Sequence, residues 1–266
     1  QAVFCEYVAE DKVFDQANPR YRAAEAQGDA MTGPTPAYAS RVVTDKFDIV
    51  MTVRKISCLL PGAWLNDEVV NYYMSLLQVR SDDKVAAWNA ASELLQNKLT
   101  SHFFSSFFIA KILEKGKYTY ENVQRWTKKF DIFKKDKIFL PVNVNNMHWT
   151  LLVLFMQDKE IHYYDSMSSQ TQLYLNAAMN WIIDEGLDKK TYRGQIRVVR
   201  SEWTLLKKYP REVMDAICAR QGASPDYVLQ QTRVSSTYVP QQMNGFDCGM
   251  FTCINADFTA DDIPLV

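Results

Sequence analysis

The sequence predicts an α+β domain in which a central mixed sheet is flanked by helices. Helical apolar periodicity recurs in separated segments, and runs rich in β-branched and aromatic residues lie between them. The 266 residues are 47% hydrophobic and 13% aromatic, which is enough to bury a large core. Helices and strands in this mixed order are typical of a layered domain.

The N-terminal part divides into an extension and the start of the domain. Residues 1–44 are predicted to be a leader, because Met31–Ser40 is rich in the residues that form turns and linkers. The domain is expected to cover residues 45–266 and to begin with a strand at Phe47–Val53.

The next elements are predicted to be helical. Asn66 can cap a helix whose first turn carries Asp67 and Glu68, where negative charge favours the helix dipole. The buried face of this helix is expected to carry apolar residues at helical spacing, namely Val69, Val70, Tyr73, Met74 and Leu77. Further helices are expected at Val85–Leu95 and Glu121–Lys129.

The sheet is predicted from three β-rich runs at Ile138–Val144, Trp149–Phe155 and Ile161–Tyr164. The polar residues 157–159 suit a hairpin turn between the last two, so the far ends of both strands return to one edge. A helix at Gln170–Glu185 and later strands at Gln195–Val199 and Ser235–Val239 complete the expected elements.

The run PQQMNGFDCGMFTC, from Pro240 to Cys253, places a cysteine where a helix is expected to begin. Apolar residues recur at helical spacing after Cys248, and Gly249 allows close backbone approach. A thiol at a helix N-terminus has a depressed pKa, because the helix dipole favours the thiolate. Cys248 is therefore a candidate nucleophile.

His148 and Asp165 are expected to meet at the edge where the predicted hairpin ends. A carboxylate on one imidazole nitrogen fixes the tautomer while the other nitrogen faces the thiol, which is the logic of a catalytic triad. Gln242 lies six positions before Cys248 and can place its side-chain amide, beside the Cys248 N–H, where an oxyanion develops.

At these residues the chain resembles the SUMO-specific (sentrin-specific, ubiquitin-like-protein) cysteine proteases of the adenain-like, papain-related fold. The order His, Asp, Gln, Cys, the HW pair and the YYDSM strand end recur there. Three further blocks agree, namely WLNDEVVNYYMSLL at Trp64–Leu77, SSFFIAKIL at Ser105–Leu113 and VQRWTKKFDIFKKDKIFLPVN at Val123–Asn143. The resemblance covers about residues 46–258, and several blocks in order are more specific than one motif.

The resemblance implies cleavage after the C-terminal Gly-Gly of SUMO, both in precursors and in lysine isopeptide bonds. It assigns Cys248 as nucleophile, His148 as base and later acid, Asp165 as orienting carboxylate and Gln242 as oxyanion donor. The substrate-binding residues it implies are Trp64 and Trp149, which would roof a narrow tunnel over the diglycine, and Asp67 near the modifier tail.

Other functions stay open beside this one. The same chemistry on NEDD8 or ubiquitin and a catalytically weak modifier-binding relic are the alternatives, because a triad says nothing about the surface that reads the modifier. The net charge of −1 does not suggest nucleic acid as a partner, no membrane span is expected, and the protein is expected to be a monomer. The family resemblance favours the nucleus or nuclear envelope, with the cytoplasm as the other compartment.

No cofactor is expected. A metal site is the competing chemistry for the candidate ligands His148, His162, Asp165, Cys248 and Cys253, but no C-x-x-C pair or H-E-x-x-H motif is present. Five scattered cysteines also disfavour a disulfide framework and point to a reducing compartment.

Several conspicuous residues have simpler interpretations. Trp88, Trp126, Trp181 and Trp203 are expected in the core, as are Cys218 and Cys253. His102 and His162 are interpreted as structural or surface residues, and Asp247 as a helix cap. The basic run formed by Lys128, Lys129, Lys134, Lys135 and Lys137 is interpreted as a solvated face, with an acidic modifier surface as its alternative partner.

Three features depart from the family pattern. Phe246 stands where a small residue is expected before the nucleophile, so substrate access or specificity is expected to change. Residues 202–233 form an expected insertion, with a helix at Pro210–Arg220. The chain ends at Val266, where the family continues, so a C-terminally truncated domain is expected.

Overall fold

The computed structural model describes residues 36–91, 99–167, 172–191, 194–207 and 239–265. The chain divides between Cys58 and Leu59 into two compact units, which are described separately. The predicted boundary between leader and domain at residues 44 and 45 stays a prediction. Within the described residues, no helix combines the length and the hydropathy needed to span a bilayer.

The first unit contains a short hairpin. Helix α3 (Pro36–Ala39) precedes strands β1 (Val42–Lys46) and β2 (Ile49–Thr52), which pair antiparallel, and α4 (Val53–Ile56) follows. The strand predicted at Phe47–Val53 is therefore too long, because β2 covers only Ile49–Thr52. Phe47 and Asp48 have φ of 60° and 58° and form the turn, so the strand begins only at Ile49.

The second unit is built on a mixed sheet that has five strands in the described part of the chain. Its order is β3 (His102–Phe103), β4 (Lys137–Val144), β5 (His148–Phe155), β6 (Glu160–Tyr164) and β9 (Thr204–Lys207). The three central strands are antiparallel neighbours, whereas β3 and β9 run parallel to β4 and β6. The strands predicted over residues 138–164 are confirmed.

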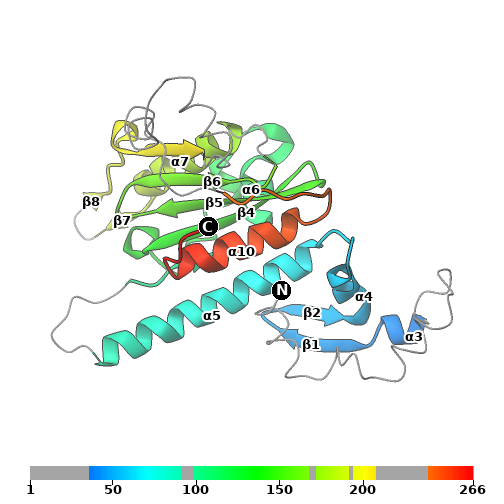
Figure 1. Ribbon diagram of the computed structural model, residues 1–266. Coiled ribbons are helices and arrows are strands. Elements are labelled where there is room, and N and C mark those ends of the chain that lie inside the picture. Colours follow the sequence, from blue (N-terminus) through cyan, green and yellow to red (C-terminus); the bar gives the residue numbers. More distant parts are fainter. Residues whose placement is uncertain (1–35, 92–98, 168–171, 192–193, 208–238, 266) are drawn as a thin grey trace. The chain divides into compact units, whose positions relative to one another are not determined.

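Helices cover both faces of this sheet (Figure 1). Helix α10 (Cys248–Ala260) packs on β5, and α5 (Asp67–Ala91) lies beside α10. Helices α6 (Phe107–Ile112) and α7 (Gln172–Asp188) lie on the other face, where Trp181 is fully buried in the core with Leu152 and Leu154. The predicted α+β class, with helices flanking a mixed sheet, is confirmed.

Two predicted helices are wrong. The segment Val85–Leu95 is not a second helix, because α5 runs without a break from Asp67 to Ala91, and residues 92–95 lie outside the described ranges. The segment Glu121–Lys129 forms only the 3-10 turn Tyr120–Asn122 and further turns. The other 3-10 turns of the described chain are Ser57–Leu59, Glu114–Gly116, Ile132–Lys134 and Arg200–Glu202.

The late strands also differ from the prediction. Of the segment Gln195–Val199, only Gln195 is in a strand, β8 (Gly194–Gln195), which pairs with β7 (Lys190–Thr191) away from the main sheet. The main sheet instead gains β9, which the sequence did not reveal. The predicted strand residues 235–238, the helix Pro210–Arg220 and Cys218 lie outside the described residues.

Not every residue assigned to the core or the surface lies there. Trp181 and Trp203 are buried, but Trp88 and Trp126 are 47% and 36% exposed, which corrects their assignment to the core. Lys137 of the basic run is buried rather than solvated, and its Nζ lies 2.6 Å from Asp262 Oδ1. Its Nζ also lies 5.9 Å from the centroid of the Phe155 ring, so this lysine is part of the structure of the domain.

Candidate active site

Cys248 is the first residue of α10 and is 2% exposed. The helix start is held by close packing at Gly249, where an added Cβ would lie 2.7 Å from Leu65 Cβ. Asp247 occupies the N-cap position, but its side chain makes no capping hydrogen bond, so the predicted capping role is wrong. The placement of Cys248 at the N-terminus of a helix is as predicted, and it favours a thiolate.

Asn244 shapes the loop before the nucleophile. Its Oδ1 accepts hydrogen bonds from the backbone N–H groups of Phe246 and Asp247, both at 3.0 Å. Its Nδ2 donates to Asp247 Oδ2 at 2.7 Å. These bonds depend on the backbone of Phe246 and not on its side chain, so the turn accepts a ring at this position, where the side chain is half-buried.

His148 and Asp165 meet at the edge of the sheet. His148 begins β5 and Asp165 directly follows β6, and the pairing of Leu151 with Tyr164 brings these ends together. His148 Nε2 lies 2.7 Å from Asp165 Oδ1, and the carboxylate is buried, with 1% of Asp165 exposed. The backbone N–H of Met167 also donates to Oδ1, at 2.8 Å.

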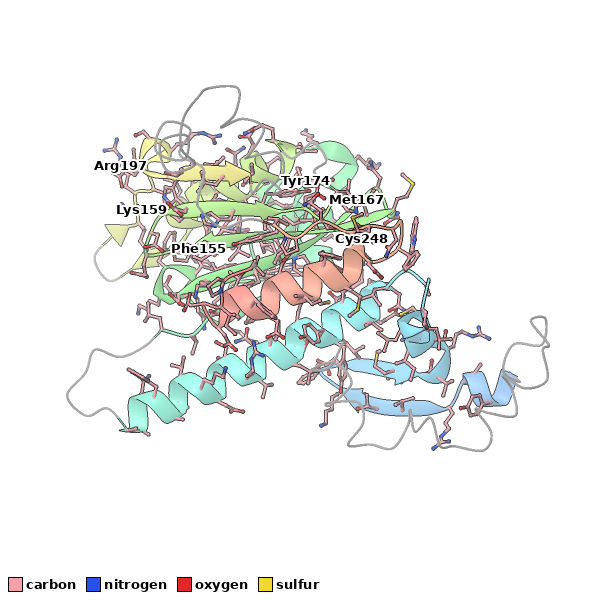
Figure 2. The ribbon with its side chains drawn as sticks, in the orientation of Figure 1. Phe155, Lys159, Met167, Tyr174, Arg197 and Cys248 are labelled. Carbon is pink, nitrogen blue, oxygen red and sulfur yellow. The ribbon has the colours of Figure 1, made fainter. Side chains whose placement is uncertain are left out.

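The thiol lies at the same end of the sheet as this pair. Figure 2 shows Cys248 and Met167 at one end of the sheet, with Phe155 and Lys159 toward the other end. Because Nε2 of His148 is bonded to Asp165, Nδ1 is the ring nitrogen left to serve Cys248, and it is buried without a hydrogen-bond partner among the described residues. Charge interaction still couples the ring to the Cys248 thiol. The structure therefore brings the three predicted triad residues together.

Charge favours an ion pair at this site. Burial disfavours the imidazolium of His148, but its hydrogen bond and charge interaction with Asp165 and its interaction with Cys248 outweigh burial and raise its pKa to about 9. For Cys248 burial opposes ionisation, yet His148 and the backbone N–H groups of Trp149 and Gly249 outweigh it and lower the pKa of the thiol. Near neutral pH these shifts favour a thiolate beside an imidazolium.

Gln242 is anchored to the residue after Asp165. Its backbone N–H donates to the Ser166 carbonyl at 3.1 Å, and its Oε1 accepts from Ser166 Oγ at 2.6 Å. Its Nε2 donates to the carbonyl of Asn244 at 2.6 Å. Gln241 adds a side-chain bond from Nε2 to the Asp165 carbonyl at 3.1 Å. The segment before the nucleophile is thereby tied to the end of β6.

The two candidate tryptophans have different environments. Trp149 is 4% exposed and donates its Nε1–H to the Leu65 carbonyl at 2.8 Å, whereas Trp64 is 51% exposed. Both flank Leu65, which packs against Gly249, so the segment before α5 lies at the nucleophile. Asp67 begins α5 and is half-buried, and Asn66 caps the helix by accepting from the Val69 N–H at 2.9 Å, as predicted.

The remaining polar candidates lie outside this site. His162 is buried, with Nε2 2.6 Å from Glu160 Oε2, and His102 packs against the rings of Phe104 and Phe130. Cys253 is buried on α10, as predicted for a core thiol. Within the described ranges, no group of three or more His, Cys, Asp or Glu side chains is placed to hold a metal ion.

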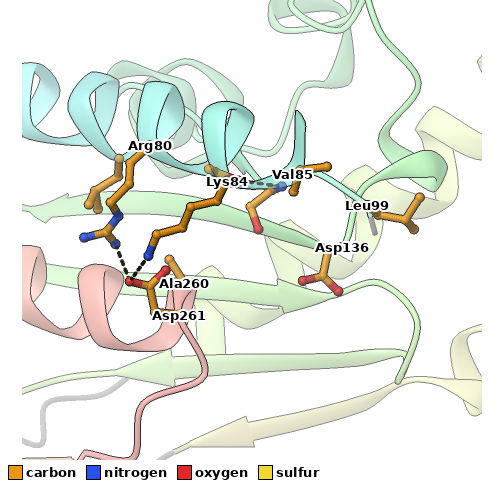
Figure 3. A pocket seen from close by; sticks show the side chains of 10 residues that line it. Arg80, Lys84, Val85, Leu99, Asp136, Ala260 and Asp261 are labelled. Atoms are coloured by element: carbon orange, nitrogen blue, oxygen red, sulfur yellow. Dashed lines mark hydrogen bonds and ion pairs between the residues drawn. The ribbon is translucent and has the colours of Figure 1, made fainter. Parts of the chain in front are cut away.

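A small surface pocket lies away from the chemistry. Arg80, Lys84, Ala260 and Asp261 are among its lining residues (Figure 3), and Ala260 ends the helix that Cys248 begins. Its cations are already paired with Asp261. The pocket therefore belongs to the packing of α5 against α10 rather than to the candidate active site.

Sequence reasoning did not identify Ser166, Asn244 or Leu65 as parts of this site. Ser166 stands directly after Asp165 in the YYDSM strand end, and that adjacency is the signal that could have revealed it. The side-chain bonds of Asn244 and the packing of Leu65 on Gly249 depend on the path of the surrounding loops, which residue type alone does not encode.

A thiol at a helix N-terminus, an imidazole and a buried carboxylate on an α+β scaffold define a site of the cysteine protease class. The chain belongs to the Ulp1 protease family, because residues 63–265 match the C-terminal catalytic domain of that family. The resemblance stated from the sequence is thus confirmed.

Curated relatives agree with this assignment. Sentrin-specific protease 2 of Homo sapiens is 30% identical over 224 residues, which cover 84% of this chain and 30% of that protein. Ubiquitin-like-specific protease 1A of Arabidopsis thaliana is 32% identical over 223 residues, which cover 82% of this chain and 36% of that protein. The chain therefore spans about a third of the length of these relatives.

Solved structures share the fold. The SUMO protease Ulp1 with its catalytic cysteine oxidised to a sulfinic acid aligns with a TM-score of 0.59 and 26% identity, covering 86% of this chain and 81% of that one. The Ulp1 protease domain in complex with SMT3, the yeast orthologue of SUMO, aligns with a TM-score of 0.57 and 23% identity, covering 91% and 84% of the two chains.

Proposed function

We propose that this protein is a thiol protease that cleaves after the C-terminal Gly-Gly of SUMO, in precursors and in isopeptide bonds to lysine. The observation that carries the proposal is the 2.7 Å contact between His148 Nε2 and Asp165 Oδ1 beside a helix-terminal thiol. Membership of the Ulp1 family supports it, as do relatives named sentrin-specific and ubiquitin-like-specific proteases.

Acylation begins with attack of the Cys248 thiolate on the carbonyl carbon of the terminal glycine. The Gln242 amide and the Cys248 N–H stabilise the oxyanion of the tetrahedral intermediate. The His148 imidazolium then donates its proton to the nitrogen of the leaving amine, and the C–N bond breaks. The products of this half-reaction are a free amine, a neutral imidazole and a thioester on Cys248.

Hydrolysis of the thioester returns the enzyme to its starting state. Neutral His148 removes a proton from water, and the hydroxide adds to the thioester carbonyl. Collapse of the second tetrahedral intermediate releases the Cys248 thiolate and the glycine carboxylic acid, which loses its own proton to solvent, while the proton taken from water stays on His148. Asp165 holds the ring in one orientation through both steps.

The tryptophans supply the basis for diglycine selection. Trp149 donates to the carbonyl of Leu65, and Trp64, the residue before Leu65, is 51% exposed. In the proposed complex the substrate tail passes between these two indole rings to reach Cys248. A slot of this kind admits glycine and rejects larger side chains by steric exclusion. Asp67, close in sequence to Trp64 in the first turn of α5, is the residue expected to lie near the modifier tail.

The test is turnover of fluorogenic C-terminal amides of SUMO, NEDD8 and ubiquitin by this chain and by its Cys248→Ala variant. The expected result is cleavage of the SUMO amide that is lost in the variant. Cleavage of NEDD8 or ubiquitin in preference to SUMO contradicts the substrate. Binding of SUMO without cleavage by the unsubstituted chain contradicts the chemistry and identifies a modifier-binding relic.

A further inference from the structure

Ser166 makes two hydrogen bonds with the proposed oxyanion donor. It lies between Asp165 and Met167 and is 3% exposed. Its Oγ lies 2.6 Å from Gln242 Oε1, and its carbonyl accepts from the Gln242 N–H at 3.1 Å. The side chain and the main chain of Gln242 are therefore both attached to this one serine.

The surroundings of the Gln242 amide define its orientation. The Asn244 carbonyl lies 2.6 Å from one amide atom, and because a carbonyl only accepts hydrogen bonds, that atom must be Nε2. The other amide atom, Oε1, therefore faces Ser166, and the serine hydroxyl must be the donor. The reverse orientation would set two carbonyl-type oxygens against each other.

This orientation leaves one N–H of the amide available. Nε2 carries two N–H bonds, and the Asn244 carbonyl uses one of them; the described residues show no second acceptor for this nitrogen. The amide torsion of glutamine is soft, so the amide needs partners at both atoms to keep one direction. Asn244 holds Nε2, and Ser166 holds Oε1.

We propose that Ser166 is a positioning residue of the oxyanion hole, whose hydroxyl holds the Gln242 amide so that its second N–H is directed at the developing oxyanion. The inference rests on the proposed function. In this arrangement two consecutive residues orient two parts of the machinery, since Asp165 orients His148 and Ser166 orients Gln242. A preorganised donor of this kind acts in the transition state and contributes little to substrate binding.

The test compares two reactions of Cys248 in the unsubstituted chain, in Ser166→Ala and in Ser166→Thr. Acylation by p-nitrophenyl acetate forms a tetrahedral oxyanion, whereas alkylation by iodoacetamide does not. Ser166→Ala is expected to slow acylation by about tenfold or more, up to the roughly 100- to 1000-fold loss found when an oxyanion donor itself is removed. Alkylation of the thiolate is expected to stay unchanged. Ser166→Thr, which keeps the hydroxyl, is expected to restore acylation.

The Gln242→Ala background separates positioning from a general structural effect. If Ser166 acts through Gln242, then Ser166→Ala slows acylation in the unsubstituted chain but not in Gln242→Ala. Equal slowing in both backgrounds overturns the inference, as does unchanged acylation in the single variant or an equal loss of alkylation. The rate of each reaction in Cys248→Ala is subtracted to remove labelling at other cysteines.

Neither reagent contains a modifier, so this test is independent of substrate recognition. With the fluorogenic SUMO amide, Ser166→Ala is also expected to lower kcat while KM stays unchanged. If Ser166→Ala slows acylation but the unsubstituted chain cleaves no modifier amide, the proposed function is contradicted while the role of Ser166 is supported.

Discussion

At Gly249 the start of the nucleophile helix packs directly on Leu65. An added Cβ would lie 2.7 Å from Leu65 Cβ and 3.0 Å from its Cγ, and neither atom is at the flexible end of a side chain. Leu65 is itself buried and its carbonyl holds Trp149. The proposed tunnel and the nucleophile are therefore positioned by the same contact.

Gly249→Ala is expected to lower the free energy of unfolding by about 1–3 kcal/mol, the usual cost of overpacking. It is also expected to lower turnover, because Cys248 moves with the helix start. The matched control is Gly245→Ala, since a Cβ at Gly245 has no atom within 4 Å. Chemical unfolding and turnover of the SUMO amide check both, and a Gly249→Ala variant as stable and active as Gly245→Ala would contradict the account.

The charge state of the active site sets its pH dependence. His148 has a pKa raised to about 9, so its imidazolium persists through neutral pH and is lost as the pH rises above that value. Above pH 9 the His148 ring is neutral and has no proton to donate to the leaving amine. Turnover is therefore expected to fall on the alkaline side near pH 9.

Asp165→Asn removes the charge that helps to raise the pKa of His148. The alkaline limit of turnover is expected to move to lower pH, toward the ordinary imidazole value of about 6.5. The loss of turnover at neutral pH is expected to be about 100-fold or more. The control is Asp158→Asn, an exposed residue in the turn at the other end of the same hairpin. A pH profile unchanged in Asp165→Asn would contradict the assignment of His148.

The sequence predicted the triad because His148 and Asp165 are placed by hairpin geometry and Cys248 by the start of a patterned helix. A hairpin returns both strand ends to one edge, so His148 and Asp165 had to be neighbours once the strands were identified. The support around Gln242 could not be predicted in the same way. The contacts of Ser166 and Asn244 depend on the path of the loop before Cys248, which has no periodic pattern.

Among the elements, α5 and α10 are joined by a charged and hydrogen-bonded cluster. Tyr73 of α5 donates its hydroxyl to Asp257 Oδ2 of α10 at 2.7 Å, and Arg80 pairs with Asp257 Oδ1 at 2.5 Å. Arg80 and Lys84 also reach Asp261, at 3.3 and 2.8 Å (Figure 3). These bonds hold the polar middle of α5 against α10.

Tyr73→Phe is expected to lower the free energy of unfolding by about 1–3 kcal/mol, because the buried carboxylate of Asp257 loses a hydrogen bond. Lys84→Ala is the control at the same helix pair. The Lys84 ammonium is solvent-exposed, so Lys84→Ala is expected to lower the free energy of unfolding by no more than about 1 kcal/mol. The measurement is the urea midpoint of each variant. Equal losses of stability in the two variants would contradict a stabilising hydrogen bond from Tyr73 to Asp257.

The wrong prediction of a helix at Glu121–Lys129 has a cause in tertiary contacts. Tyr120 and Thr127 both donate to the fully buried carboxylate of Glu185 on α7. Seven residues of α-helix would separate them by about 10 Å along the axis, too far for one carboxylate to reach easily. A series of turns brings both hydroxyls to Glu185, and this overrides the local helical pattern.

For the whole molecule, the sequence predicted the class of the fold and the order of its main elements. The long, strongly patterned segments, β4 to β6, α7 and α10, follow the prediction. Short elements such as β9 were not predicted, because four residues carry too little pattern and their pairing with β6 is long-range. The localisation in the nucleus or nuclear envelope, the insertion at 202–233 and the monomeric state stay predictions.

The most direct measurement of the central claim is covalent capture by SUMO that carries a C-terminal electrophile in place of its terminal carboxylate. The account predicts one adduct, mapped by mass spectrometry to Cys248, that is absent in Cys248→Ala and retained in Cys253→Ala. The buried Cys253 lies on the same helix and serves as the matched thiol. An adduct at another cysteine, or capture of ubiquitin but not SUMO, would contradict the account.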